Sequence, residues 1–178
     1  MVTNNSTNTY IVPTTNNEIT QPSQPAFFAT LQAAADNVTG DGTLYILGDT
    51  DVGATLVEIF DQNADLNPGS SAGAIFTAPV TGRYFLTTNI NVSDLEEDNN
   101  IQSITIHTSN RYHIAPLNAP GITRDSSDQY GNTLAVLADM DAADTAVVEI
   151  EFSNTAKAVD MISHASSNFC SFAGYLVI

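Results

Sequence analysis

Two apolar runs flank a Pro-Val-Thr-Gly segment within residues 73–92, GAIFTAPVTGRYFLTTNINV. Pro79 fixes one backbone angle and Gly82 can adopt a positive φ, so this segment predicts a tight corner between two strands. Alternate residues of the second run share one side of a pleated strand: Tyr84, Leu86, Thr88, Ile90 and Val92. The intervening residues, which are mostly polar, share the other side: Phe85, Thr87, Asn89 and Asn91. The pattern predicts a strand with one packed face and one largely polar face.

Short β-like runs recur from residue 26 onward, separated by clusters of Gly, Asn, Asp and Pro. Their short, fairly even spacing predicts an all-β fold, an antiparallel sandwich or barrel. At 178 residues the chain has the length of one domain with a substantial core. Only residues 31–37 have a pattern compatible with a helical turn. The predicted strands are 26–33, 43–47, 55–61, 74–78, 83–92, 101–108, 132–138, 145–152 and 169–178.

Four basic residues stand against twenty acidic ones, which gives a formal net charge of -16. The chain therefore lacks the cations that contact phosphates, and we expect neither nucleic acid nor a membrane surface as a partner. No stretch approaches the length of a membrane span, and the first residues lack the basic and hydrophobic regions of a signal peptide. The single cysteine, Cys170, lies in an apolar run and is expected to be a small core residue rather than a reactive thiol.

Residues 1–25 are rich in Thr, Asn, Gln and Pro, a composition that cannot bury enough apolar surface to fold alone. They are predicted to form an extended N-terminal arm, with residues 26–178 as the folded domain. The arm either clamps another chain or lies along its own domain. For the first alternative, the candidate anchoring residues are Tyr10, Ile11, Val12 and Pro13.

Five segments, in this order, resemble the globular head of complement component one-q. They are residues 26–29 (AFFA), 59–63 (IFDQN), 76–85 (FTAPVTGRYF), 137–145 (LADMDAADT) and 172–177 (FAGYLV). The resemblance covers residues 26–178, and its more specific parts are the spacing of Phe76, Gly82 and Tyr84 and the closing Phe-x-Gly-Tyr-Leu. It implies a jelly-roll sandwich that associates as a homotrimer, as in this family and its tumour-necrosis-factor relatives.

The segment Thr-Ala-Pro-Val-Thr-Gly-Arg-Tyr also resembles the version of this domain found in bacteria and their viruses, where it occurs in virion appendages. It implies a non-enzymatic structural protein on a bacteriophage particle, assembled in the host cytoplasm. The expected role is a trimeric capsid decoration or cement protein, or a short head fibre, anchored to other virion proteins by the arm. The alternatives are a receptor- or glycan-binding tip of a tail fibre and a bacterial complement-like recognition domain.

The aromatic residues exceed what one thin sandwich must bury, and the alternative for each is the ordinary core. The resemblance implies that some line the threefold axis. The candidate trimer-interface residues are Phe28, Tyr84, Phe172 and Tyr175.

Two acidic clusters are candidate cation sites. Asp139, Asp141 and Asp144 lie close together on a predicted interstrand loop, and calcium prefers clustered carboxylate oxygens. This loop lacks the Gly and distal Glu of a calcium-binding hand loop, so a solvated turn is the favoured interpretation and no cofactor is expected apart from the calcium alternative. The denser acidic run within residues 94–98 is interpreted as a solvated loop tip.

Catalytic signals are weak. His107 and His113 would face each other if Ser109 and Asn110 formed a hairpin turn, although surface histidines with ordinary partners are the favoured interpretation. The chain contains no Gly-x-Ser-x-Gly, no His-Glu-x-x-His and no glycine-rich phosphate loop. The sequence therefore predicts a protein that binds rather than an enzyme.

Overall fold

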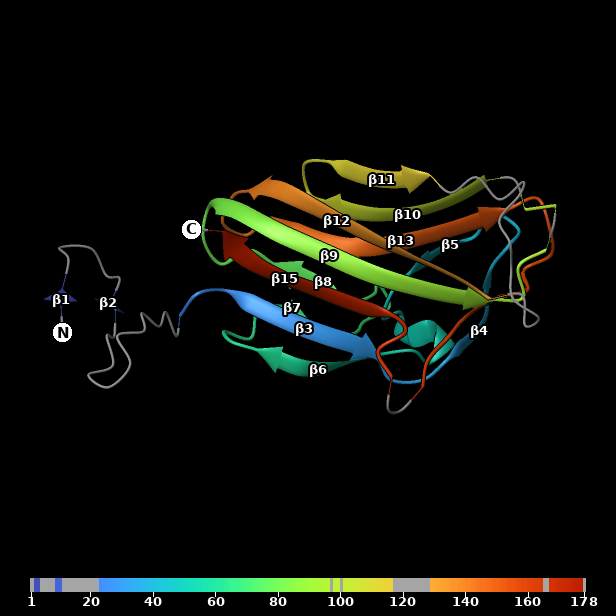
Figure 1. Ribbon diagram of the computed structural model, residues 1–178, viewed down its shortest axis with the longest axis horizontal. Helices are drawn as coiled ribbons and strands as arrows, with labels where there is room; N and C mark the ends of the chain where they lie inside the picture. Colours follow the sequence, from blue (N-terminus) through green and yellow to red (C-terminus); the bar gives the residue numbers. More distant parts are fainter. Residues whose placement is uncertain are drawn as a thin grey trace.

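The protein is an antiparallel β-sandwich with the layers of a jelly roll (Figure 1). The computed structural model describes residues 2–3, 9–10, 23–96, 98–99, 101–116, 129–164 and 167–177. No helix in these ranges is long and apolar enough to cross a membrane. One short 3-10 helix, η1 (Thr50–Val52), begins after Asp49, whose side chain accepts a hydrogen bond from the Asp51 N–H.

The seven-stranded sheet carries the residues on which the functional argument depends. Its strand order is β4 (Ala35–Thr39), β14 (Val159–Met161), β9 (Gly82–Ser93), β15 (Ser171–Val177), β3 (Ala26–Leu31) and β6 (Leu56–Asp61), and β12 (Tyr130–Met140) also pairs with β9. The β12–β9 pairing is unbroken over eleven residue pairs, which makes these two strands the longest shared ladder of the sheet.

The six-stranded sheet covers one face of the first. Its order is β11 (Tyr112–Pro116), β10 (Ile101–Thr108), β13 (Thr145–Ser153), β8 (Ile75–Thr77) and β7 (Leu66–Asn67), and β5 (Leu44–Ile46) also pairs with β13. Two further short strands, β1 (Val2–Thr3) and β2 (Thr9–Tyr10), pair with each other as a separate sheet.

Aromatic rings from both sheets meet in the core. Phe76 of β8 stacks on Phe27 of β3 with ring centroids 4.7 Å apart, and it also meets Tyr84 of β9 edge-on at 5.4 Å. Phe172 of β15 contacts Phe27 at 4.9 Å in an edge-on arrangement. All four side chains are essentially inaccessible to solvent. Such aromatic pairs add to the stability gained from burying their area.

All nine predicted strands are present, and the alternation on β9 is confirmed. The residues assigned to the packed side, from Tyr84 to Val92, are buried, while those of the other side are partly exposed. The helical turn considered for residues 31–37 is wrong, because Ala35–Thr39 forms β4 and pairs with β14. The expectation for Cys170 is confirmed: its side chain is buried, and its Sγ lies 3.2 Å from the carbonyl oxygen of Ile162.

Candidate self-association face

The face of the seven-stranded sheet that points away from the core is unusually apolar. Large hydrophobic side chains that are exposed in the described residues number eleven, and six of them lie on three strands of this sheet: Val57, Ile59, Phe60, Leu137, Tyr175 and Val177. Isolated exposed hydrophobic residues are normal on a protein surface, but a contiguous group of them marks an interaction site.

Strand register places some of these exposed residues beside half-buried aromatic residues in two adjacent rows across the sheet. One row contains Tyr175, Phe85 and Leu137, and the next contains Phe60, Phe28 and Ala173. The Phe85 and Tyr175 rings lie 5.4 Å apart and the Phe28 and Phe60 rings 6.3 Å apart. We call this surface the apolar band; its residues are Phe28, Phe60, Phe85, Leu137, Tyr175 and Val177.

The apolar band is bordered by polar residues further along β9. Asn89 and Asn91 both donate side-chain hydrogen bonds to the carbonyl oxygen of Phe169, and the Thr133 hydroxyl donates to Asn89 Oδ1 at 3.1 Å. These side chains already have partners within the chain. The part of this face that is left without contacts among the described residues is therefore its apolar surface.

The structure divides the predicted interface residues into two pairs. Phe28 and Tyr175 lie on the apolar band, at an accessible place for contact with a second chain. Tyr84 and Phe172 must be corrected, because both point into the core and have 0% exposure. The Tyr84 hydroxyl donates to the Val80 carbonyl oxygen at 2.7 Å, so its polar end is also satisfied within the chain. The alternation along β15 separates the two kinds of residue. Phe172 lies on the same side of the strand as the buried Gly174, whereas Tyr175 lies on the opposite side.

The base of the N-terminal arm is held at one end of this sheet. Gln24 Nε2 donates to the Leu176 carbonyl oxygen at 2.6 Å, and the Leu176 N–H donates to the Pro25 carbonyl oxygen at 3.0 Å. The start of β3 and the end of β15 therefore lie together (Figure 1). The candidate anchoring residues Ile11, Val12 and Pro13 lie outside the described residues, and Tyr10 is described only as part of β2.

The candidate calcium ligands form a hydrogen-bonded turn between β12 and β13. Asp144 Oδ2 accepts from the Asp141 N–H at 2.7 Å and from the Asn110 side-chain amide at 2.6 Å. Asp139 lies on β12, where its cross-strand neighbour is Arg83. Within the described ranges no group of three or more His, Cys, Asp or Glu residues could hold a metal ion. The turn is held by hydrogen bonds within the chain, and calcium binding at it stays a prediction.

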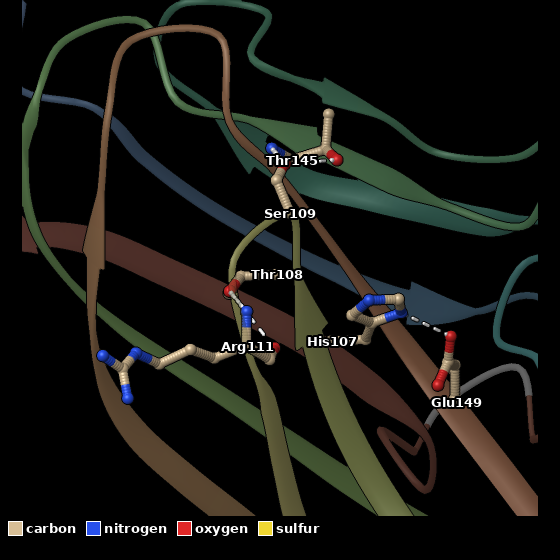
Figure 2. Close-up of polar contacts among 6 residues, drawn as sticks. All are labelled: His107, Thr108, Ser109, Arg111, Thr145 and Glu149. Carbon is tan, nitrogen blue, oxygen red and sulfur yellow. Dashed lines mark hydrogen bonds and ion pairs between the residues drawn. The ribbon is translucent and has the colours of Figure 1, made fainter.

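Ser109 and Asn110 do form the turn between β10 and β11, but His107 and His113 do not face each other. His107 is the cross-strand partner of Tyr112, and the centroids of their stacked rings are 3.9 Å apart. His113 is the cross-strand partner of Ile106 and lies on the opposite face of the sheet. Figure 2 shows the His107 Nδ1 atom beside Glu149 Oε1, at 2.8 Å. The histidine therefore has ordinary partners, as the favoured interpretation expected.

The acidic run after β9 lies on a loop that is held by neutral residues. Leu95 is buried, and the buried Asn99 accepts from the Glu96 N–H at 3.0 Å while its amide donates to the Ser153 carbonyl oxygen at 3.1 Å. Asp94, Glu96 and Asp98 are exposed. This agrees with a solvated loop; Glu97 lies outside the described residues.

Comparison with known proteins identifies the fold. No family model and no curated protein matches the sequence. The structure is similar to the globular domain of zebrafish complement 1qA protein, with a TM-score of 0.56, 12% identity, and coverage of 88% of this chain and 98% of that one. Murine APRIL at pH 8.0 gives 0.53 at 11% identity, covering 87% and 100% of the respective chains. The PRD1 vertex protein P5 gives 0.57 at 9% identity, covering 100% of this chain and 86% of P5. At these identities the comparisons establish the jelly-roll sandwich fold.

Proposed function

We propose that the protein is a non-enzymatic structural protein of a bacteriophage particle and that it associates as a homotrimer through the apolar band. The observation that carries the self-association is the group of exposed aromatic and aliphatic side chains on one sheet face. Contact with another chain would bury this apolar surface, which is favourable by a free energy of roughly 25 cal/mol per Å² buried. A second copy of the same chain is the partner that is always present at matching concentration.

A rotationally closed ring of copies suits this surface, because the apolar band runs across the sheet from β6 to β12 and its two margins belong to different strands. Phe60 lies at the β6 margin and Leu137 at the β12 margin. A head-to-tail contact, in which one margin meets the other, closes a ring when the rotation permits it. The likeness to complement and APRIL domains, and the sequence resemblance to trimeric families, support a ring of three.

The location on a phage particle is supported by the likeness to the PRD1 vertex protein P5, which extends over the whole chain. The acidic composition and the sequence segments similar to virion appendages agree with it. Within such a particle we propose a capsid decoration, a cement protein or a short head fibre. The arm would join the trimer to the shell, and three arms per trimer would strengthen a weak individual contact through effective concentration.

The self-association step is tested by Tyr175→Glu, which puts a charge into the middle of the apolar band. Tyr112→Glu is the matched control, because Tyr112 is also an exposed tyrosine but lies on β11 of the other sheet. Sedimentation should give trimers for the wild type and the control and smaller species for Tyr175→Glu. A trimer of unchanged stability in Tyr175→Glu would contradict the proposed face.

The capsid role is tested by adding purified protein to shells that lack it and measuring their resistance to heat. A variant that lacks residues 1–22 separates the arm from the head. It keeps residues 23–25, whose contacts with Asn63 and Leu176 belong to the sandwich. We expect the wild type to bind and protect the shells and the truncated trimer to bind far less. Normal binding by the truncated trimer would contradict anchoring through the arm.

A receptor-binding tip remains the second candidate, and it is favoured by one specific observation. Tyr112 and Ile114 are both exposed on β11, in the sheet opposite the apolar band, and would stay accessible in a trimer built on that band. Binding of the purified protein to host cells, reduced by Tyr112→Ala and without any effect on shell stability, would support this candidate over the capsid role.

A further inference from the structure

The outer face of the six-stranded sheet carries exposed apolar side chains on both sides of two carboxylates. Glu149 and Glu151 of β13 point away from the core. Register places Ile114 of β11 in the same row as Glu149, two strands away. Leu44 of β5 is the direct cross-strand neighbour of Glu151. Ile114 is 56% exposed, Leu44 49%, and Tyr112, two residues before Ile114, 63%. We call this surface the β13 face; its residues are Leu44, Tyr112, Ile114, Glu149 and Glu151.

The two carboxylates have one basic neighbour between them. Glu149 Oε1 lies 2.8 Å from His107 Nδ1 (Figure 2). No other ion pair is present in the part of the chain that the structure describes, so Glu151 pairs with no cation there. Figure 2 also shows the Arg111 side chain pointing away from Glu149. The β13 face therefore carries negative charge that is not balanced by the described residues around it.

The spacing of the two carboxylates fits an extended segment of another molecule. Glu149 and Glu151 are alternate residues of one strand, so their side chains leave the same face about 7 Å apart. Alternate side chains of any extended peptide have this spacing, so two cations at alternate positions can each meet one carboxylate. The Glu149 side chain is only 13% exposed, and such partial burial strengthens an ion pair relative to one in open water.

Charge also decides among the possible occupants of the β13 face. A second copy of this chain carries a net charge of -16 and would be repelled. A basic segment is attracted both by the whole molecule and by the two carboxylates, which arginine binds through two parallel hydrogen bonds. The exposed Tyr112 ring can contact a further cation through its face. These features favour a cationic partner.

We propose that the β13 face binds an extended basic segment of a partner protein. Arginine or lysine side chains at alternate positions contact Glu149 and Glu151, and apolar side chains beside them pack on Ile114 and Leu44. This inference goes beyond the proposed assembly and does not depend on the trimer, because it uses the sheet opposite the apolar band. It gives the receptor-binding candidate a class of partner.

The test uses two labelled peptides of identical composition as probes. In Val-Ser-Arg-Ser-Arg-Ser-Val the arginines occupy alternate positions and leave the same side of an extended chain, whereas in Val-Ser-Arg-Arg-Ser-Ser-Val they are adjacent and leave opposite sides. Binding to the full chain is followed by fluorescence anisotropy at one salt concentration, since charge-driven binding weakens with salt. We expect the alternating peptide to bind more tightly than the adjacent one.

Two double variants locate the site. Glu149→Gln/Glu151→Gln removes both charges of the β13 face, and glutamine keeps an oxygen that can accept from His107. Asp36→Asn/Glu58→Gln is the matched control, because it also removes two carboxylates but from β4 and β6 of the other sheet. The first variant should bind the alternating peptide about tenfold more weakly than the wild type, and the control should bind nearly as the wild type does.

Three results would overturn the inference. The first is no binding of the alternating peptide by the wild type. The second is equal binding of the two peptides or an equal loss in the two variants, which would show a general attraction to net charge. The third is binding of the neutral sugar maltohexaose that is lost in Glu149→Gln/Glu151→Gln, which would assign the face to a glycan. Sedimentation of the same variants tests self-association separately, so a trimer that has lost the peptide leaves the apolar band unaffected.

Discussion

Gly174 provides a sharp test of the packing, because there is no room for a side chain at this position of β15. A Cβ added to Gly174 would lie 2.6 Å from Leu86 Cδ2 and 2.8 Å from Phe27 Cε1. Both neighbours are fully buried, and Phe27 is held between Phe76 and Phe172. The glycine of the closing Phe-x-Gly-Tyr-Leu segment thus permits the close approach of three strands.

We expect Gly174→Ala to destabilise the fold by about 2–3 kcal/mol, the upper part of the range for overpacked cores, because neither neighbour can move without disturbing others. For a domain of this size this lowers Tm by roughly 4–12 °C. Thermal unfolding should be followed at one fixed protein concentration, since association with other copies also raises the apparent stability.

A double-mutant cycle identifies the cause. Leu86→Ala removes the nearest clashing atom, so the loss in Gly174→Ala/Leu86→Ala should be smaller than the sum of the two single losses by about 1 kcal/mol or more. Strictly additive losses, or a Gly174→Ala protein as stable as the wild type, would refute this account of the packing.

Two further predictions concern buried or crowded polar groups. The Tyr45 hydroxyl is buried and makes no hydrogen bond of ordinary geometry with the described residues; burial raises its pKa, and the Gly48 backbone lowers it by a smaller amount. Tyr45→Phe should therefore leave stability unchanged or raise it by up to about 1–2 kcal/mol in denaturant unfolding; a clear loss would show that the contact with the Gly48 backbone is a stabilising hydrogen bond. Burial, together with Asp36 and Asp94, raises the pKa of Asp160 above its usual 3.8, so the folded state binds the proton more tightly than the unfolded state. The contribution of Asp160 to stability therefore falls as pH rises from about 3.8 through the raised pKa. Asp160→Asn, which can still accept from the Asn37 N–H, should be more stable than wild type near neutral pH and lose this advantage in acid; the opposite pH trend would contradict it.

The sequence predicted the strands whose alternation or turn residues are strong. Residues 83–92 alternate without interruption, and Pro79 and Gly82 mark the preceding corner, so β9 was predicted with both faces correctly assigned. The sequence missed β4, β7, β11 and β14, and two of these, β4 and β14, lack such signals. β14 is three residues long, and β4 contains Asp36 and Asn37, with Asn37 at a positive φ of 54°. These segments are strands because neighbouring strands pair with them, and this pairing cannot be inferred from the local strand propensity of their residues.

The candidate face was only partly predicted for a different reason. The number of aromatic residues indicated that some of them would lie outside the core. The number alone did not indicate which ones. Of the four candidate interface residues, Phe28 and Tyr175 lie on the outer face of the sheet and stay candidates, whereas Tyr84 and Phe172 belong to the core. Leu137 was missed because its exposure depends on β12 lying beside β9 at the edge of the sheet, a pairing between segments about fifty residues apart.

The mass of the protein in solution tests the central claim most directly. Sedimentation equilibrium over a range of concentrations should give three times the 18.9 kDa chain mass, and Tyr175→Glu should shift the distribution toward the single chain. A wild-type protein that remains at one chain mass at every concentration would show that the apolar band does not join copies of this chain.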